Sequence, residues 1–296
     1  MNTYTITGAT GNTGKPIALG LLDKGHKVRI VSRSREKARE LISKGAELFE
    51  GDHSDVELLK RAFNGVDAVY AMIPFNPAPD NYLDFQMSYI NPMVEAIKVA
   101  GVRYVVTLSS VGAHLTTGAG VVEGVAIMEK HLNAIEHLNV MHLRPSYFME
   151  NTLAQVGAIK AMGMMASPVK GDLKFPMVAT RDIAATGLAQ LLSLNFSGKN
   201  HHYVLGSRDV SYDEIASIYG ETIGKPDLKY LTVSYEDGKN ALMQAGFSQN
   251  GAERMVEFVK SLNEGRVFEQ ALRSSDNTTP TSIEEFASVF KMVYNS

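Results

Sequence analysis

The sequence predicts an α/β fold, a doubly wound parallel sheet followed by a small C-terminal α/β lobe. Short apolar, β-branched runs alternate with amphipathic segments along the first half of the chain. Nearly continuous apolar strands joined by helices are typical of a parallel sheet covered on both faces. Right-handed crossovers make such a sheet doubly wound. The chain of 296 residues is long enough to bury a core of this size.

Strands and helices are expected to alternate regularly in the first half. The strands are predicted at residues 4–7, 27–31, 46–50, 67–73, 104–108 and 140–143. The helices are predicted at residues 16–22, 36–44, 55–63, 82–100 and 125–136. Ligands of such sheets bind beyond the carboxyl ends of the strands, so the residues that follow each strand are the candidate site residues.

After residue 145 the alternation is less regular. Helices are predicted at residues 151–164, 181–192, 211–223, 235–245, 251–262 and 282–294, and strands at 175–178, 202–205 and 229–233. Thr180 and Asp182 are expected to cap the helix at 181–192. We expect residues 1–150 to form the sheet domain. Residues 151–296 are expected to form a smaller lobe folded onto it, not an independent domain.

Composition narrows the class of protein. The chain has no cysteine, which excludes disulfides, cysteine-ligated zinc and thiol catalysis. Its net charge of −3 gives no reason to expect nucleic-acid binding. No apolar run approaches the roughly 18 residues that cross a bilayer, and the chain starts in a strand without a secretion signal. We therefore expect a cytoplasmic protein with neither a membrane nor a nucleic-acid partner.

Three glycines spaced three residues apart stand between the first predicted strand and the first helix. Gly8 suits a tight turn, Gly11 lets the backbone approach a diphosphate, and Gly14 lets the helix pack closely on the sheet. The free N–H groups at the start of that helix then hold an anion. This loop predicts dinucleotide binding through Gly8, Thr10, Gly11, Asn12, Thr13 and Gly14.

The second strand ends in Ser-Arg-Ser-Arg. A site that prefers NAD usually has an Asp or Glu here for the ribose hydroxyls. This chain instead has Arg33 and Arg35, with Lys37 shortly after. Guanidinium groups match a phosphate, so we expect NADPH in preference to NADH. The alternative is that these are solvated charges at a helix start, a place where the helix dipole does not favour cations.

Further cofactor contacts are expected after the third and fourth strands. Asp52 either accepts a hydrogen bond from the adenine amino group or caps the next helix, and the sequence leaves both open. His53 is expected to be a loop residue. Ala71, Met72 and Ile73 are expected to pack under the adenosine and its ribose.

The ends of the fifth and sixth strands are expected to face the nicotinamide through Ser109, Ser110, Pro145, Tyr147 and Phe148. The two serines either orient a carboxamide or carbonyl, or satisfy backbone groups at the strand end. The two aromatic side chains lie either beside the nicotinamide or in the core of the lobe. The eight histidines show no metal-ligand spacing, so no metal site is expected.

These residues resemble the NmrA-like family of atypical short-chain dehydrogenases/reductases. The segments that carry the resemblance are residues 8–14, 32–33, 51–52, 108–110 and 143–151, and residues 178–184 and 280–286 are similar to the family's C-terminal signatures. The resemblance implies that residues 1–150 are an NAD(P)-binding Rossmann domain. It also implies two kinds of relatives: NAD(P)H-dependent reductases of quinones, azo compounds or enones, and cofactor-binding proteins that report redox state to a partner.

One departure from the wider superfamily concerns its Tyr-x-x-x-Lys pair. In that pair the lysine lowers the phenol pKa, so that the tyrosine can exchange a proton with the substrate oxygen. Counting back from Glu129, which resembles the acidic residue after the pair, leads to Val121 and Val125. No tyrosine lies between Tyr104 and Tyr147. The usual proton-transfer pair is therefore absent.

We favour an NADPH-dependent reductase of a quinone-like or other conjugated carbonyl, because hydride delivery is the cofactor's own chemistry. The candidate polar groups near the reacting oxygen are Ser110, His114, Tyr147 and Asn151. The alternative is a non-catalytic redox sensor that acts through a partner protein. A nucleotide-sugar epimerase is disfavoured, since it would need the missing tyrosine and lysine. The substrate is expected to be small and apolar or aromatic, and a homodimer stays open.

Overall fold

The computed structural model describes all 296 residues and contains a wholly parallel seven-stranded sheet. The predicted doubly wound α/β fold is confirmed. Along the sheet the strands lie in the order β10 (Lys199–Val204), β6 (Asn139–Pro145), β5 (Tyr104–Leu108), β4 (Ala68–Ala71), β1 (Thr3–Ile6), β2 (Lys27–Ser32) and β3 (Glu47–Glu50). The order reverses at β1, beside β4, which is the switch point where ligands bind in such sheets.

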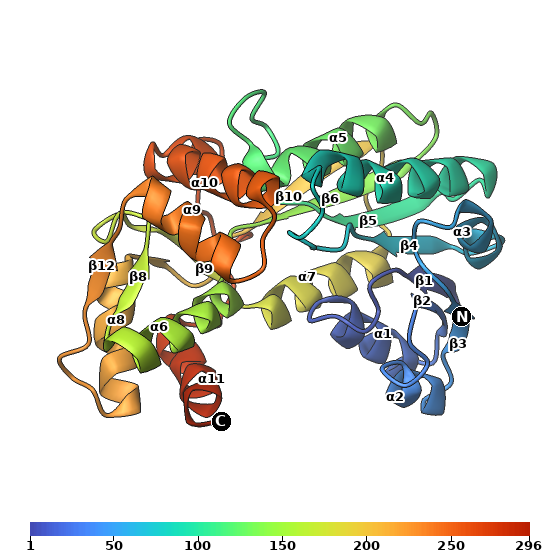
Figure 1. Cartoon of the computed structure of the whole chain (residues 1–296). Helices are drawn as coiled ribbons and strands as arrows, with labels where there is room; N and C mark the ends of the chain where they lie inside the picture. Colours follow the sequence, from blue (N-terminus) through green and yellow to red (C-terminus); the bar gives the residue numbers. More distant parts are fainter.

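Helices cover both faces of this sheet (Figure 1). On one face lie α1 (Gly14–Asp23), α2 (Arg39–Ser43) and α7 (Thr180–Ser193), and on the other lie α3 (Val56–Phe63), α4 (Tyr82–Val99) and α5 (Glu123–Asn133). Strand β1 shows why, since its side chains alternate. Tyr4 and Ile6 enter the core shared with α1, whereas the hydroxyl of Thr5 donates to the carbonyl of Ala62 at 2.6 Å on the α3 side.

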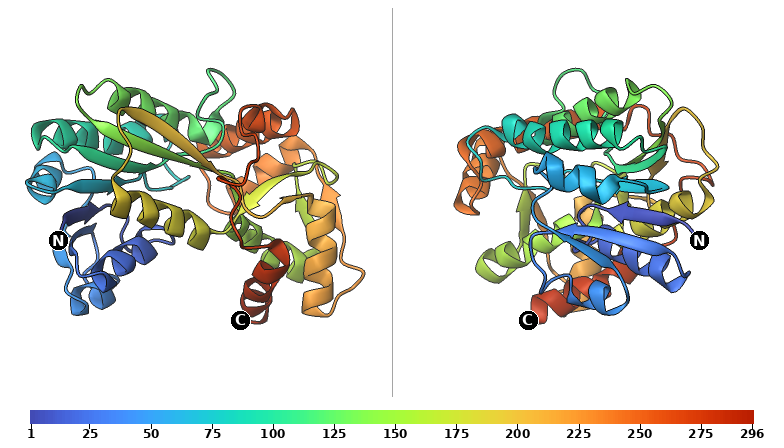
Figure 2. Two further views of the ribbon diagram at one scale, coloured as in Figure 1. Left: turned by 180° about the vertical axis from the view of Figure 1, so that it is seen from behind. Right: turned by 90° about the vertical axis from the view of Figure 1, so that its right-hand side faces the viewer.

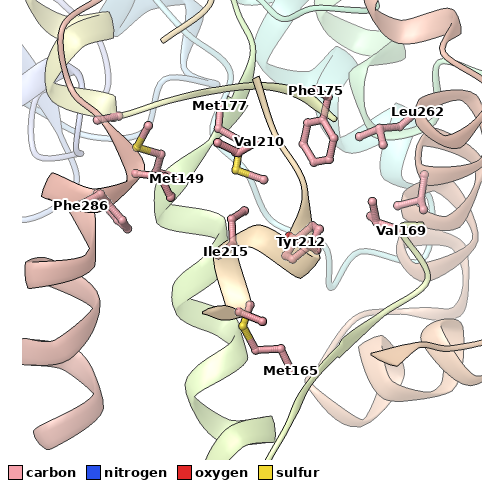
Figure 3. Close-up of a cluster of buried hydrophobic side chains, with 14 of the residues drawn as sticks. Met149, Met165, Val169, Phe175, Met177, Val210, Tyr212, Ile215, Leu262 and Phe286 are labelled. Atoms are coloured by element: carbon pink, nitrogen blue, oxygen red, sulfur yellow. The ribbon is translucent and has the colours of Figure 1, made fainter. Parts of the chain in front are cut away.

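The C-terminal lobe lies beyond the carboxyl ends of the sheet strands (Figures 1 and 2). Its two small sheets contain β11 (Asp209–Val210), β9 (Phe175–Val178) and β7 (Tyr147–Phe148), and β12 (Tyr230–Thr232) with β8 (Met165–Ser167). Its helices are α6 (Gln155–Met162), α8 (Tyr212–Ile223), α9 (Tyr235–Gln244), α10 (Gln249–Asn263) and α11 (Ile283–Asn295). Methionines and aromatic side chains fill its core, among them Met149, Met177, Phe175 and Tyr212 (Figure 3).

Several predicted elements differ from the structure. The helix predicted at 151–164 is wrong in part: a 3₁₀ helix, η2 (Met149–Ala154), precedes α6, and Gly163 turns the chain into β8 with a φ of 71°. Strands β7 and β11 have two residues each and were not predicted. Two further 3₁₀ helices, η1 (Gly120–Val122) and η3 (Arg266–Phe268), lie in connections. Such short elements have no periodicity to detect.

The predicted cap of α7 is also wrong. The helix begins after Ala179 without a side-chain cap. The hydroxyl and backbone N–H of Thr180 both donate to the carboxylate of Glu150, at 2.6 and 3.0 Å. Asp182 accepts hydrogen bonds from the hydroxyl and N–H of Thr281, at 2.7 and 3.0 Å. Both side chains therefore join α7 to the lobe.

The chain passes between the two parts more than once. Residues 151–296 contribute strand β10 to the large sheet and helix α7 to the layer that covers it, so a division at residue 150 describes the chain only in part. Helix α7 packs on α1, and β10 pairs with β6 from Lys199 to Val204. The two parts are thus tied by shared secondary structure. None of the helices has both the length and the apolarity that a bilayer crossing requires.

Candidate functional site

The glycine loop lies at the carboxyl end of β1, where the strand order reverses. Gly8 has a φ of +63°, and a Cβ there would lie 2.6 Å from the sulfur of Met72. A Cβ on Gly14 would lie 2.3 Å from the carbonyl oxygen of Gly8. A Cβ on Gly11 would meet only that same oxygen, at 3.3 Å. Gly8 and Gly14 are thus required by the loop's own packing, whereas Gly11 keeps its outer side open for a ligand.

Backbone N–H groups of this loop are available to an anion. Gly11 donates to the Gly8 carbonyl at 2.9 Å and Lys15 to the Gly11 carbonyl at 3.1 Å. The N–H groups of Thr10, Asn12, Thr13 and Gly14 donate to no other group of the chain. Together with the positive end of α1 they suit a diphosphate. The side chain of Thr13 points inward and accepts from the phenol of Tyr70 at 3.1 Å.

His53 supports the glycine loop through a hydrogen bond to its backbone, although the sequence predicted no such role. Its Nε2 accepts a hydrogen bond from the N–H of Gly8 at 3.4 Å. Burial lowers the pKa of His53, which keeps the ring neutral and able to accept. The Met72 N–H donates to the hydroxyl of Thr7 at 3.0 Å, which fixes the end of β4 beside the loop.

Arg33 and Asp52 form the ribose and adenine end. The guanidinium of Arg33 lies 3.5 Å from the carboxylate of Asp52, and its side chain is 74% exposed. Burial acts to raise the pKa of Asp52, but hydrogen bonds from Ser54 and Tyr89 and the nearby Arg33 hold it below its usual value. A single exposed pair of this kind contributes little stability, so Arg33 is free to turn toward a phosphate.

The alternative of Asp52 as a helix cap is resolved by the structure. The cap of α3 is Asp55, whose carboxylate accepts from the N–H groups of Glu57 and Leu58 at 2.9 and 3.0 Å. Asp52 instead accepts from the N–H of Ser54 at 2.9 Å, which shapes the turn after β3.

The remaining predicted cofactor residues are distributed along the same edge. Arg35 is exposed and pairs with Glu50 at 3.2 Å, and Lys37 is also exposed. Ala71 is buried in the core on the α3 and α4 side, whereas Met72 and Ile73 are half-buried at the edge. Pro145 is buried at the end of β6. The edge is therefore continuous from β2 to β6.

The end of β5 is held by a buried ion pair that the sequence did not predict. Both carboxylate oxygens of Glu129 accept from the guanidinium of Arg144, at 2.9 and 2.6 Å. The hydroxyl of Ser109 donates to the same carboxylate at 2.5 Å. Burial acts to raise the pKa of Glu129, but the hydrogen bonds from Arg144 outweigh this effect and hold the pKa below its usual value. Arg144 also donates to the phenol of Tyr203 at 3.3 Å.

The two serines that follow β5 have different surroundings. The hydroxyl of Ser109 is directed to Glu129 on α5, consistent with strand alternation. Ser110 is half-buried, and its hydroxyl donates to no group of the chain. Ser146, which follows β6, is buried, and its hydroxyl has no partner. Ser110 and Ser146 thus both have an unpartnered hydroxyl, and of the three serines Ser110 is the one that is not buried.

Tyr147 belongs mainly to the lobe. Its ring packs edge-on against Phe175 with centroids 5.7 Å apart, and its phenol oxygen accepts from Tyr212 at 3.2 Å. Burial raises the pKa of Tyr147, which hydrogen bonds with Tyr212 and Asn151 offset only in part. Asn151 itself is exposed. Phe148 packs in a small cluster with Val178, between the sheet and the lobe.

His114 lies on the loop between β5 and α5, which is held by the C-terminal lobe. Its Nε2 is 3.2 Å from the carbonyl oxygen of Arg266, and its Nδ1 is buried without a partner. Arg266 donates to the carbonyl of Thr117 at 2.8 Å, and Ser261 to that of Gly118 at 2.8 Å. His114 is thus placed where the two parts of the molecule meet.

Val121 lies in η1 and Val125 in the first turn of α5, and both pack into apolar clusters. The carbonyl of Val121 accepts from the side-chain amide of Gln86 at 3.1 Å. The oxygen of the Gln86 amide accepts from the N–H of Gly124 at 3.2 Å. Valine side chains cannot transfer protons, so this stretch has a packing role. A buried glutamine on α4 that ties two helices gives no signal in a single sequence.

Comparisons with known proteins show the family of this chain. A sequence model of the NmrA-like family matches residues 1–287. The NAD(P)H azoreductase of Xenophilus azovorans is 27% identical over 253 residues, which cover 85% of this chain and 84% of that protein.

Two solved structures share the fold. The NADPH-dependent quinone oxidoreductase of Escherichia coli, complexed with NADPH, has a TM-score of 0.80 at 22% identity, with coverage of 97% and 99%. NmrA, a negative transcriptional regulator in complex with NADP, has a TM-score of 0.77 at 16% identity, with coverage of 99% and 97%. The chain belongs to the NmrA-like family.

Proposed function

We propose that this chain is an NADPH-dependent reductase of a quinone-like or other conjugated carbonyl acceptor. The observation that carries the proposal is the glycine loop with Arg33 at its ribose end. The open side of Gly11 and the unpartnered N–H groups at Thr10, Asn12 and Thr13 fit a diphosphate. The similarity to an NAD(P)H azoreductase supports a reductase rather than another use of the cofactor.

The cofactor preference follows from charge. Arg33 is exposed and has only Asp52 as an ion-pair partner, so it can bind a 2′-phosphate. Arg35 and Lys37 add positive charge nearby. No carboxylate occupies the position at the end of β2 that usually accepts from the ribose hydroxyls. NADPH is therefore preferred over NADH.

The chemistry depends on position rather than on a strong acid. A bound nicotinamide supplies the hydride, and water supplies the proton that completes reduction of the acceptor. We expect Ser110 and Asn151 to donate hydrogen bonds to an acceptor oxygen as it gains negative charge. His114 lies within hydrogen-bond distance of the Arg266 carbonyl in η3, which attaches the loop after Ser110 to the C-terminal lobe.

The missing tyrosine selects the class of acceptor. With Val121 in η1 and Val125 in the first turn of α5, neither position has a side chain that can exchange a proton with the substrate. A quinone tolerates this, because its reduced oxygen is a stabilised oxyanion that takes a proton from water. An isolated ketone would form an alkoxide, which needs a nearby acid. Conjugated acceptors are therefore expected and simple ketones are not.

The test is the rate of NADPH oxidation with a panel of acceptors: benzoquinone, menadione, an azo dye, cyclohex-2-enone and a saturated ketone. We expect turnover with the quinones and none with the ketone. The panel is run beside a direct measurement of NADPH binding by the change in NADPH fluorescence. Micromolar binding without turnover of any acceptor would contradict the reductase and favour the redox sensor that acts through a protein partner.

A further inference from the structure

A proline-rich segment at the carboxyl edge of the sheet is hydrogen-bonded to the C-terminal lobe. It comprises residues 74–81, between β4 and α4, and is called the strap below. The carbonyls of Pro77 and Pro79 accept from the N–H and the hydroxyl of Ser248, at 3.0 and 2.7 Å. The side chain of Asn250 accepts from the N–H of Tyr82 at 2.9 Å, directly after the strap. Figure 1 shows the segment before α4 beside the turn that joins α9 and α10.

The strap is closely fitted to that turn. A Cβ on Gly251, at the start of α10, would lie 2.3 Å from the carbonyl oxygen of Pro77. The strap also carries prolines at three of its eight positions, which restrict its backbone before any contact forms. It is therefore held in one place by both parts of the molecule.

This segment presents an exposed aromatic side chain. Phe75 is 57% exposed, although Tyr82 and Phe247 each contact it edge-on with ring centroids 6.2 Å away. Tyr82 comes from α4 and Phe247 from the α9–α10 turn. A single exposed phenylalanine on a mobile loop would be unremarkable in a soluble domain. Here the ring is fixed by neighbours from both parts while much of its surface stays accessible.

Phe75 is near the cofactor loop. The side chain of Met72 touches Gly8, and its N–H is bonded to Thr7. Three residues of extended chain span at most about 11 Å, and residues 72–78 have no helix, strand or turn. The ring therefore lies within the length of a dinucleotide from the glycine loop. It also lies at the carboxyl edge of the sheet, which is where ligands of such folds bind.

We propose that Phe75, backed by Phe247, is the aromatic wall of the acceptor site and selects planar aromatic acceptors. This rests on the proposed reductase function for the chemistry, but the binding role is independent of it. A planar acceptor offers a π face to stack on the ring, which adds to the apolar contact. A small non-aromatic enone offers neither that face nor the area.

The test compares Phe75→Ala with the wild type on two acceptors. We expect the KM for menadione, a planar naphthoquinone, to rise about tenfold. The KM for cyclohex-2-enone and the Kd for NADPH are expected to stay unchanged. Phe247→Ala should raise the KM for menadione about threefold, and Phe75→Tyr should restore it because the ring is kept. Met292→Ala, at an exposed apolar residue on α11, is the matched control.

A second measurement separates this inference from the reductase. Calorimetry of menadione binding to the protein saturated with NADP⁺ requires no turnover. Weaker binding to Phe75→Ala supports the wall even where the wild type turns over no acceptor. An unchanged menadione affinity and KM in Phe75→Ala, or an equal loss of NADPH binding, would overturn it. Thermal unfolding checks that each variant is folded, and Phe75→Leu replaces Phe75→Ala where that variant is not.

Discussion

The two ends of the sheet's carboxyl edge are built from different kinds of group. At the β1–β3 end, backbone N–H groups and the exposed Arg33 face outward and bind nothing else strongly. At the β5–β6 end, the polar side chains bind one another: Ser109 and Arg144 both donate to Glu129. The first end is ready for an anion. The second is a rigid support in which the charges are already neutralised.

This difference fits a site that binds a dinucleotide through backbone N–H groups and Arg33, and that has no free acidic side chain for proton transfer. Burying Glu129 and Arg144 is tolerated because each neutralises the other and both are hydrogen-bonded. Their pairing fixes β5, β6 and α5 relative to one another, which places Ser110 at the edge. Catalysis in such a site depends on holding the reactants in position.

The largest effect is expected at the buried pair. Glu129→Gln leaves the Arg144 charge buried without its partner, which should lower the free energy of unfolding by about 3 kcal/mol. Urea denaturation measures this. Glu57→Gln removes one of the two exposed carboxylate partners of Lys60 on α3 and should change stability by less than about 0.5 kcal/mol. Equal losses of unfolding free energy in the two variants would show that the Glu129–Arg144 pair does not hold β5, β6 and α5 together.

A similar loss is expected on acidification. Burial lowers the pKa of His142 on β6 to about 4 from its usual 6.5, so the folded protein resists a proton that the unfolded chain accepts. The stabilising contribution is complete above pH 6.5 and is lost as the pH falls toward 4, by about 3 kcal/mol. Unfolding measured between pH 4 and 7 tests this.

The matched variant is His142→Gln. In this variant the free energy of unfolding should depend less on pH between pH 4 and 7. The ring nitrogens of His142 bond to Thr107 and Asn133 at 2.8 and 3.1 Å, so glutamine keeps some of this bonding. A slope as steep as that of the wild type would assign the acid sensitivity to other groups.

At the β1 end, Gly14→Ala should weaken NADPH binding by about 100-fold. The added Cβ meets the Gly8 carbonyl at 2.3 Å, so the loop must move. NADPH fluorescence titration measures the Kd. The control is Gly157→Ala on α6, where a Cβ meets nothing within 4 Å. Unchanged binding in Gly14→Ala would mean that the cofactor does not use this loop.

A smaller effect is expected at the ribose end. Arg33→Ala should raise the Kd for NADPH about tenfold through loss of a charge-assisted hydrogen bond, and leave that for NADH unchanged. Arg103→Ala is the matched control, since Arg103 is exposed and precedes β5 at the opposite edge of the sheet. If Arg33→Ala weakened both cofactors alike, Arg33 would not be the 2′-phosphate group.

The smallest effect is expected at Tyr147. Its phenol is bonded to Tyr212 and its pKa is raised, so it is a poor proton donor. Tyr147→Phe should lower kcat by less than about threefold and leave the pH profile of kcat unchanged, because it keeps the ring against Phe175 and removes only a hydroxyl that accepts from Tyr212. A loss of about 100-fold or more, within the range of general acid catalysis, would make Tyr147 the acid and remove the contrast between the two ends.

The sheet and the cofactor loop could be predicted because their signals are local. Alternating apolar runs mark the strands, and the spacing of Gly8, Gly11 and Gly14 marks the turn between β1 and α1. The C-terminal lobe was predicted less well. Strands of two or three residues and the break between η2 and α6 depend on packing from distant segments, which outweighs local preference.

By itself the sequence determined the α/β class, the glycine loop and the positive charge at the end of β2, since each depends on neighbours in the chain. Only the tertiary structure decided which polar groups are free. Glu129 and Arg144 meet across 15 residues, Gly8 and His53 across 45, and the strap and Ser248 across about 170. These pairings depend on how the strands cross over and the lobes meet, and residue type alone does not specify which partner is reached.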